Sequence, residues 1–288
     1  MILVTGAAGK TGLAVCRALV KRGAAVRAVV RRPEQVHTLL ALGAAEAVVC
    51  DVRSGTELAG PARGTRAFIH ICPNMNPDEV PIGKAAIYAA QQAHVERFVF
   101  YSVLHPQTEE MPHHWHKLRV EEALLRSGLG HTILQPAPYM QNILAGWDSI
   151  VSRGVYRVPY GASTRLGLVD LDDVAAATAI VTTTSGHDGA IYELAGDEVL
   201  TQTEIARVLA RVVGRDVQVE VEPHDAWQRR VRAAGLSPYA IETLIRMFSY
   251  YELHGFFGNG NVLRWLIGRA PGGLEDFARR MISSHLRA

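Results

Sequence analysis

Residues 2–14 read ILVTGAAGKTGLA, and this stretch decides the fold class because a strand, a tight turn and a helix follow one another in it. The apolar run at residues 2–5 has the composition of a buried strand, and glycines follow at positions 6, 9 and 12. The next segment carries apolar residues at helical spacing, namely Leu13, Cys16, Leu19 and Val20. Gly23 is the expected C-terminal cap of that helix. The stretch therefore predicts a strand–turn–helix unit at the start of a domain.

The first half of the chain repeats this alternation. Five more short β-rich runs occur at residues 25–30, 47–50, 67–71, 98–101 and 132–134. The segments between them are long enough for crossover helices, so the strands are expected to run parallel, with helices on both faces of the sheet. The predicted fold class is α/β, a Rossmann-type doubly wound parallel sheet.

The second half has a looser pattern. A loop is expected around Gly154, Pro159 and Gly161, then a strand near Leu168 and a helix at residues 173–183 capped by Asp172. Thr201 and Glu204 form a capping-box pattern for a helix that Gly214 closes, and the chain reads as helical from Pro223 onward. These signals predict a Rossmann domain at residues 1–152, which also receives about 165–184, and a smaller, mainly helical substrate lobe at 153–288.

Composition excludes several classes of function. The 288 residues contain 30 Lys+Arg and 28 Asp+Glu, a formal charge of +2, and the scattered basic residues offer no field for direct nucleic-acid binding. Cys16, Cys50 and Cys72 form no CxxC pair, as is typical of a reduced, cytoplasmic protein. No run of about 18 apolar residues is present, and Met1 leads directly into the first strand, so we expect neither a membrane span nor a secretory signal.

The glycine turn predicts a dinucleotide site. Glycines allow the sharp turn, the close approach of a pyrophosphate to the backbone, and tight packing of the helix on the strand. The helix N-terminus then offers N–H groups and a positive dipole to the phosphates. The alternative is a glycine turn that binds nothing.

The second strand points to NADP(H) rather than NAD(H). It ends in Arg31 and Arg32, where an NAD site usually has an acid for the ribose hydroxyls, so a 2′-phosphate would meet cations there. The alternative is that both arginines are solvated surface charges. Asp51, after the third strand, either meets the adenine or caps the next segment.

Several motifs together resemble the NmrA-like branch of the atypical short-chain dehydrogenase/reductases. They are GAAGKTG, CDV, FVFYSVLHP, KLRVEEALLRSGLGHTILQPAPYMQN, VDLDDVAAA and LIGRAPGGLEDFAR. The resemblance implies pyrophosphate binding around Gly6, Gly9, Lys10, Thr11 and Gly12, a 2′-phosphate near Arg31, and adenine near Asp51 and Val52. It further implies nicotinamide near Cys72, Ser102, Lys117 and Pro136, with Tyr139 and Asn142 facing the substrate.

The stretch HHWHK, residues 113–117, holds the candidate catalytic pair. Short-chain enzymes generally use Tyr-x-x-x-Lys, and here His113 occupies the tyrosine position and Lys117 the lysine position. A spacing of four places both side chains on one helical face. Lys117 is expected to bind the cofactor, or else is an exposed helix lysine. The cation beside His113 favours a neutral imidazole, which can still polarise a carbonyl.

Alternatives remain for the neighbouring residues. His113, His114 and His116 form a polar loop over the cofactor if His113 is not a proton donor, and no metal site is expected because the cluster lacks a cysteine. Ser102 either orients a substrate oxygen or caps the backbone, and Cys72 is either a redox sensor or an inert thiol. On composition alone, Tyr139 and Asn142 are equally consistent with partly buried loop residues.

The sequence predicts an NADPH-dependent reductase of a small apolar carbonyl, quinone or enone. The cofactor carries out the hydride transfer, so the protein needs only to place the substrate and stabilise developing negative charge. The alternative is a redox regulator without catalysis, which senses NADP(H) and passes the signal to a protein partner.

Overall fold

The computed structural model describes residues 1–73 and 75–285, which fall into two compact units. The first unit comprises Met1–Glu109, His113–Pro136 and Asp172–Glu193, and the second comprises Glu110–Pro112, Ala137–Leu171 and Leu194–Ala288. The sequence placed the boundary near residue 152, whereas the main part of the second unit begins at Ala137. The reason is that Met140, Ile143, Trp147 and Ile150 pack in the hydrophobic core of the second unit.

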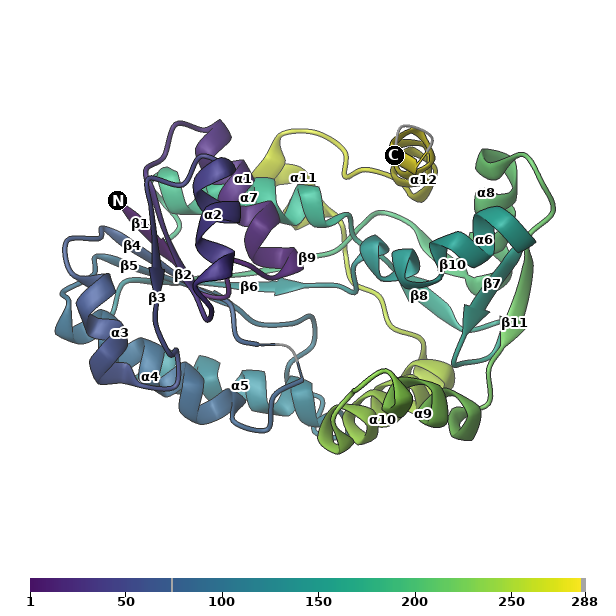
Figure 1. Cartoon of the computed structure of the whole chain (residues 1–288), viewed down its shortest axis with the longest axis horizontal. Helices are drawn as coiled ribbons and strands as arrows, with labels where there is room; N and C mark the ends of the chain where they lie inside the picture. Colours follow the sequence, from purple (N-terminus) through teal and green to yellow (C-terminus); the bar gives the residue numbers. More distant parts are fainter. Residues whose placement is uncertain (74, 286–288) are drawn as a thin grey trace. The chain divides into compact units, whose positions relative to one another are not determined.

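The first unit is built on a seven-stranded sheet with strand order β3-β2-β1-β4-β5-β6-β9 (Figure 1). The strands are β1 Ile2–Val4, β2 Val26–Val30, β3 Glu46–Val49, β4 Ala67–His70, β5 Arg97–Tyr101, β6 His131–Pro136 and β9 Ala190–Leu194. Every pairing from β3 across to β6 is parallel. The six predicted strands are confirmed close to their expected bounds, and β9 is an additional strand that the sequence did not predict.

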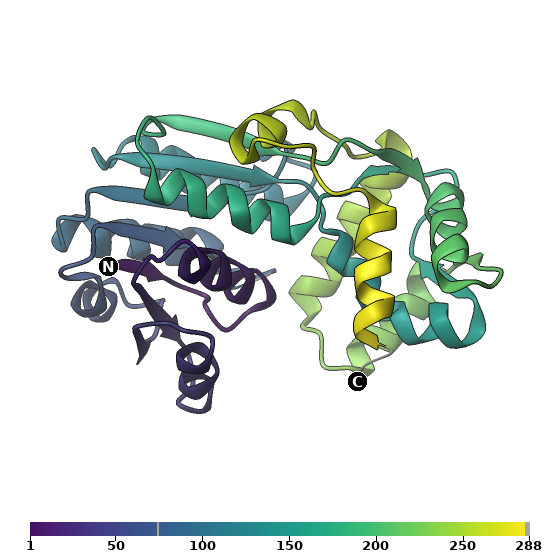
Figure 2. The ribbon, with the colours of Figure 1, turned by 90° about the horizontal axis from the view of Figure 1, so that it is seen from above.

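Helices cover both faces of this sheet. They are α1 Lys10–Lys21, α2 Glu34–Ala41, α3 Gly55–Ala62, α4 Glu79–Gln92, α5 Pro112–Leu125 and α7 Leu171–Thr183. Figures 1 and 2 show α1, α2 and α7 on one face, and α3, α4 and α5 lie on the other (Figure 1). The predicted cap of α7 is wrong, because the helix begins at Leu171 and Asp172 lies within its first turn.

The chain reverses its order of strands between β1 and β4. β1 pairs with β2 on one side and with β4 on the other, and all three run parallel. In doubly wound sheets, ligands bind at the carboxyl ends of the strands at this point. Gly6 follows β1 and Ile71 follows β4, so both lie at this edge of the sheet.

The second unit combines two small sheets with helices. Its elements are η1 Met140–Gly146, α6 Trp147–Arg153, β7 Val155–Val158, β8 Arg165–Gly167, β10 Val199–Thr201, α8 Gln202–Val213, β11 Gln218–Val221, α9 His224–Ala233, α10 Pro238–His254, α11 Asn261–Ile267 and α12 Leu274–His285. β10 pairs antiparallel with β8, and β11 pairs parallel with β7. The capping box of Thr201 and Glu204 and the closing Gly214 are confirmed. The segment expected to be a loop contains β7.

Candidate active site

The glycine loop is shaped so that only glycine fits at two of its positions. Gly6 has φ +62°, and a Cβ atom there would lie 2.6 Å from the carbonyl oxygen of Ile71. A Cβ atom on Gly12 would collide with the carbonyl oxygen of Gly6 and with Ala7. The loop therefore keeps its backbone bare and tightly folded against the end of β4, as close approach of a pyrophosphate requires.

The N-terminus of α1 is open to an anion. Its N-cap residue is Gly9, which has no side chain to cap the helix, and the first turn contains no acidic residue. The first N–H groups of a helix have no partner within the helix, and its dipole favours negative charge. Gly9, Lys10, Thr11 and Gly12 thus form a cradle that fits a dinucleotide pyrophosphate.

Three charged side chains gather after β2 and β3. Arg31 is exposed, and no described residue forms an ion pair with its guanidinium. Asp51 accepts a bidentate contact from Arg53, whose Nε lies 3.0 Å from Oδ1 and whose Nη2 lies 2.6 Å from Oδ2 of the carboxylate. The Arg53 guanidinium lowers the pKa of Asp51, and the charge of Arg31 lowers it further. The sequence did not single out Arg53, whose exposed position resembles that of many surface arginines.

Lys117 is buried at the carboxyl end of β5. Its side chain is 6% exposed, and Nζ donates a hydrogen bond of 2.8 Å to the carbonyl oxygen of Tyr101. The ammonium also lies 5.1 Å from the centre of the Phe100 ring. The interpretation of Lys117 as an exposed helix lysine is therefore wrong, and its position on the sheet edge above the β5 terminus stays compatible with cofactor binding.

The counter-ion of Lys117 is Glu79, which the sequence did not single out. Glu79 is the first residue of α4, its side chain is 1% exposed, and its Oε1 lies 2.8 Å from Lys117 Nζ. The helix dipole favours an acidic side chain at the start of a helix, and such a side chain is usually solvated. Nothing in the sequence therefore marks Glu79 as buried. Both side chains of this ion pair are buried.

Near Glu79 and Lys117, α4 and α5 touch at one close contact, between Gly83 and Val120. A Cβ atom on Gly83 would lie only 2.5 Å from Cγ1 of Val120. Gly83 is four residues after Glu79, and Val120 is three residues after Lys117, so each pair shares one helical face. The small residue on α4 thus lets the two charged side chains approach each other across the interface.

His113 lies beside this ion pair and is also buried. Its Nδ1 is 3.8 Å from Glu79 Oε2, which is too long for a hydrogen bond. Burial, followed by the positive charge of Lys117, holds the pKa of His113 well below the ordinary value. Burial likewise lowers the pKa of His114 to about 4. The imidazole of His113 is therefore neutral at physiological pH.

Ser102 directly follows β5, and Pro136 is the last residue of the neighbouring strand β6. Ser102 is buried, and its Oγ makes no hydrogen bond of normal geometry to any described residue, although it lies close enough to help lower the pKa of Glu121. The carboxylate of Glu121 accepts hydrogen bonds of 3.0 and 3.2 Å from Gln135 Nε2, and burial is the main influence that raises its pKa. Pro136 accepts a backbone hydrogen bond from Leu104.

Cys72 has the environment of an inert thiol. It is 8% exposed, and burial raises the pKa of the thiol, with the negative charge of Glu79 acting in the same direction. Reactive thiols require the opposite, a lowered pKa and access to solvent. Val52, predicted to lie near adenine, is half-buried beside Asp51.

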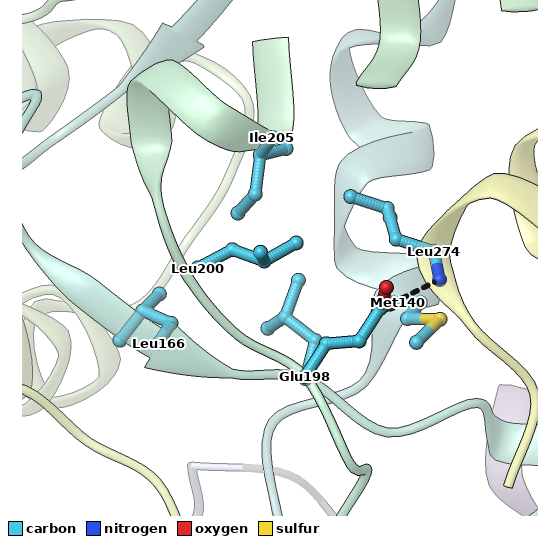
Figure 3. A pocket seen from close by; sticks show the side chains of 7 residues that line it. Met140, Leu166, Glu198, Leu200, Ile205 and Leu274 are labelled. Carbon is cyan, nitrogen blue, oxygen red and sulfur yellow. Dashed lines mark hydrogen bonds between the residues drawn. The ribbon is translucent and has the colours of Figure 1, made fainter. Parts of the chain in front are cut away.

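The second unit holds Tyr139 and Asn142, the two residues expected to face the substrate. Tyr139 directly precedes η1 and pairs with Val169, and the Asn142 amide donates to the Tyr139 carbonyl at 3.0 Å. Nearby in this unit, a small pocket has mostly apolar walls (Figure 3). It is lined by Met140, Leu166, Leu168, Glu198, Leu200, Ile205 and Leu274. The Glu198 carboxylate in this lining accepts a 2.7 Å hydrogen bond from the backbone N–H of Leu274 at the start of α12 (Figure 3).

Comparison with known proteins identifies the family. Residues 1–278 match the NmrA-like family. The chain belongs to the NmrA-like family. Among its NmrA-like relatives, quinone oxidoreductase 2 of Escherichia coli (strain K12) is 27% identical, over 93% of this chain and 94% of the relative. NAD(P)H azoreductase of Xenophilus azovorans is 30% identical, over 76% of each chain.

The fold of this NmrA-like chain also matches solved structures. An NADPH-dependent quinone oxidoreductase from Escherichia coli, solved in complex with NADPH, superposes with a TM-score of 0.85 at 26% identity and covers 100% of both chains. Within residues 1–73 and 75–285, no group of three or more His, Cys, Asp or Glu side chains is arranged to hold a metal ion. In the same described part of the chain, no helix combines the length and the apolar character needed to cross a membrane.

Proposed function

We propose that this protein is an NADPH-dependent reductase of a small apolar carbonyl, quinone or enone. The observation that carries the proposal is the buried Lys117 ammonium, which lies at the carboxyl end of β5 on the same sheet edge as the open glycine loop after β1. This combination supplies a phosphate cradle and a fixed cation along one edge of a doubly wound sheet, where a dinucleotide binds.

The cofactor-binding roles divide between the two ends of this edge. Gly6, Gly9, Lys10, Thr11 and Gly12 would hold the pyrophosphate, and Arg31 would bind the 2′-phosphate, which makes NADP(H) the preferred dinucleotide. Asp51 and Val52 would lie at the adenine. Cys72 and Pro136 would border the nicotinamide.

Lys117 binds a hydroxyl of the nicotinamide ribose in this proposal. An ammonium has three N–H donors; the Tyr101 carbonyl takes one and the Glu79 carboxylate faces the ammonium. A donor therefore remains for the ribose. When bound, reduced nicotinamide supplies the hydride.

His113 and Ser102 assist the acceptor. A neutral imidazole carries one N–H, and this group would donate to the substrate oxygen on which negative charge develops. The Ser102 hydroxyl would orient the same oxygen. Tyr139 and Asn142 in the second unit are proposed substrate contacts.

Steady-state consumption of NADPH tests this function. Purified protein would be supplied with NADPH and a panel of quinones, enones and aldehydes, and NADH would replace NADPH in a parallel series. Turnover above buffer with at least one acceptor, and a preference for NADPH, is the expected result. Bound NADPH without turnover of any acceptor would reject the reductase and favour a cofactor-sensing role.

A further inference from the structure

Glu79 is a buried acid to which the proposed reaction assigns no role. Both of its carboxylate oxygens are sealed from solvent, and neither receives a hydrogen bond of normal geometry from any described residue. The contact with Lys117 is therefore an ion pair at 2.8 Å whose angle does not suit a hydrogen bond. A carboxylate in such a place is costly unless a cation compensates it.

Several ionisable groups surround the Lys117 ammonium. From α4 comes Glu79, from α5 come His113 and Glu121, and from β4 and the residues after it come His70 and Cys72. The histidines are neutral, because burial and the charge of Lys117 lower the pKa of His113 well below its ordinary value and that of His70 to about 3. Glu121 is hydrogen-bonded to Gln135 instead. Glu79 is thus the acid in direct contact with the ammonium.

We propose that Glu79 is a positioning residue: its carboxylate holds the Lys117 ammonium against the Tyr101 carbonyl and compensates its charge, so that Lys117 presents a fixed donor to the nicotinamide ribose. The inference rests on the proposed function for the identity of the ligand. The evidence for the ion pair is the 2.8 Å distance between Glu79 Oε1 and Lys117 Nζ within the first unit, and it does not depend on that function. Glu79 acts through Lys117 and does not touch the substrate.

The contact between Gly83 of α4 and Val120 of α5 supports this role. It brings the two helices together within one turn of the place where Glu79 and Lys117 form their ion pair. A purely structural ion pair would not need its cation bonded to the carbonyl that ends β5. That bond places the ammonium at the carboxyl edge of the sheet.

The test compares four variants in NADPH binding by calorimetry. Glu79→Gln keeps the shape but removes the charge, Glu79→Asp keeps the charge, and Lys117→Met removes the cation. Glu121→Gln is the matched control, because Glu121 is a buried acid of α5, the helix that carries Lys117, and it is hydrogen-bonded to Gln135. We expect Glu79→Gln to raise the Kd for NADPH roughly tenfold or more, Glu79→Asp to recover part of the loss, and Glu121→Gln to leave the Kd within about twofold.

Dependence on pH separates positioning from general damage. A buried ammonium without a counter-ion gives up its proton more readily, so the Kd ratio of Glu79→Gln to wild type should increase from pH 6 to pH 9. In a Lys117→Met background, Glu79→Gln should cause no further loss of affinity. A constant ratio across pH, or an equal loss in the Lys117→Met background, would overturn the proposal.

Stability provides a readout that needs no cofactor. An unpaired buried lysine loses its proton at a lower pH than an unfolded lysine, whose pKa is about 10.4. Between these two pH values the unfolded state binds more protons than the folded state. The stability of Glu79→Gln relative to wild type should therefore rise with pH. Urea unfolding at pH 7 and pH 9 measures this. A wild-type protein that binds no NADPH would refute the proposed function. The ion-pair role of Glu79 would then be tested by the unfolding measurements, and it would be refuted if the stabilities of Glu79→Gln and wild type changed in parallel with pH.

Discussion

Gly83 of α4 and Val120 of α5 lie in such close contact that a single methyl group cannot be added between them. A Cβ atom at position 83 would lie 2.5 and 2.6 Å from the two Cγ atoms of Val120, distances that Cβ atoms in proteins essentially never show. A valine side chain is stiff and cannot swing aside easily. The contact therefore sets how near Glu79 comes to Lys117.

Gly83→Ala should destabilise the protein and weaken NADPH binding. Overpacking of this kind typically costs about 1–3 kcal/mol, and the helices must separate at the Glu79–Lys117 pair. Gly60→Ala is the control, because Gly60 lies in α3 with nothing within 4 Å of an added Cβ atom. That variant should keep its stability or gain up to about 1 kcal/mol. Urea unfolding of both variants checks this, and equal stabilities would contradict the close packing.

Arg31→Ala should reduce the affinity for NADPH far more than that for NADH. None of the described residues forms an ion pair with the Arg31 guanidinium, which leaves it available to a 2′-phosphate, and its loss is expected to raise the Kd for NADPH about tenfold or more. Arg32→Ala is the control, since Arg32 already pairs with Glu34 at 3.1 Å. Calorimetric titrations with both dinucleotides measure the effect. An unchanged NADPH affinity would remove Arg31 from the site.

The buried histidines predict a loss of stability in mild acid. Burial lowers the pKa of His70 to about 3 and that of His114 to about 4, whereas an unfolded histidine has a pKa of about 6.5. The unfolded state therefore binds more protons between these values, so stability is full above about pH 6.5 and falls as the pH drops. Each such histidine contributes up to about 1.4 kcal/mol per pH unit.

Urea unfolding at pH 7, 6 and 5 tests this slope. His114→Gln should show a shallower decrease than wild type, and His37→Gln, at an exposed position of α2, should follow wild type. Identical slopes in all three proteins would mean that His114 is protonated in the folded state.

The three cysteines should be unreactive while the protein is folded. Burial raises the pKa of Cys16 to about 12, and burial, followed by the charges of Glu57 and Asp51, raises that of Cys50. Thiolate is the reactive form, so titration with a disulfide reagent at pH 7 should be slow until denaturant is added. Rapid reaction of one thiol with an accompanying change in NADPH affinity would instead support redox sensing by Cys72.

Much of the first unit could be predicted from the sequence because its strands are continuous apolar runs and its glycine loop has a fixed spacing. β7 was missed because its VYRV sequence lies between Gly154 and Pro159 and its partner β11 is far along the chain, so no local pattern reveals the pairing. β9 was missed because an edge strand is only partly buried, and its IYEL residues carry a weak signal.

The candidate site could be predicted only for residues whose spacing along one helix places their side chains together. HHWHK placed His113 and Lys117 on one helical face, and both are found together with Glu79. Glu79 and Arg53 could not be anticipated, because their roles depend on which elements pack together rather than on neighbours in the sequence. The burial of Lys117 likewise follows from the approach of α4 to α5.

The most direct test of whether bound NADPH reduces an acceptor is a single-turnover experiment. Protein saturated with NADPH is mixed with an acceptor that is active in the steady-state panel, and the loss of reduced-nicotinamide absorbance is followed alongside the same experiment with Lys117→Met. We expect oxidation of one equivalent of NADPH per bound cofactor in the wild type, and in Lys117→Met a weaker affinity for NADPH and loss of the rapid phase. Bound NADPH that stays reduced in the wild type, or equal binding and oxidation in both proteins, would contradict this expectation.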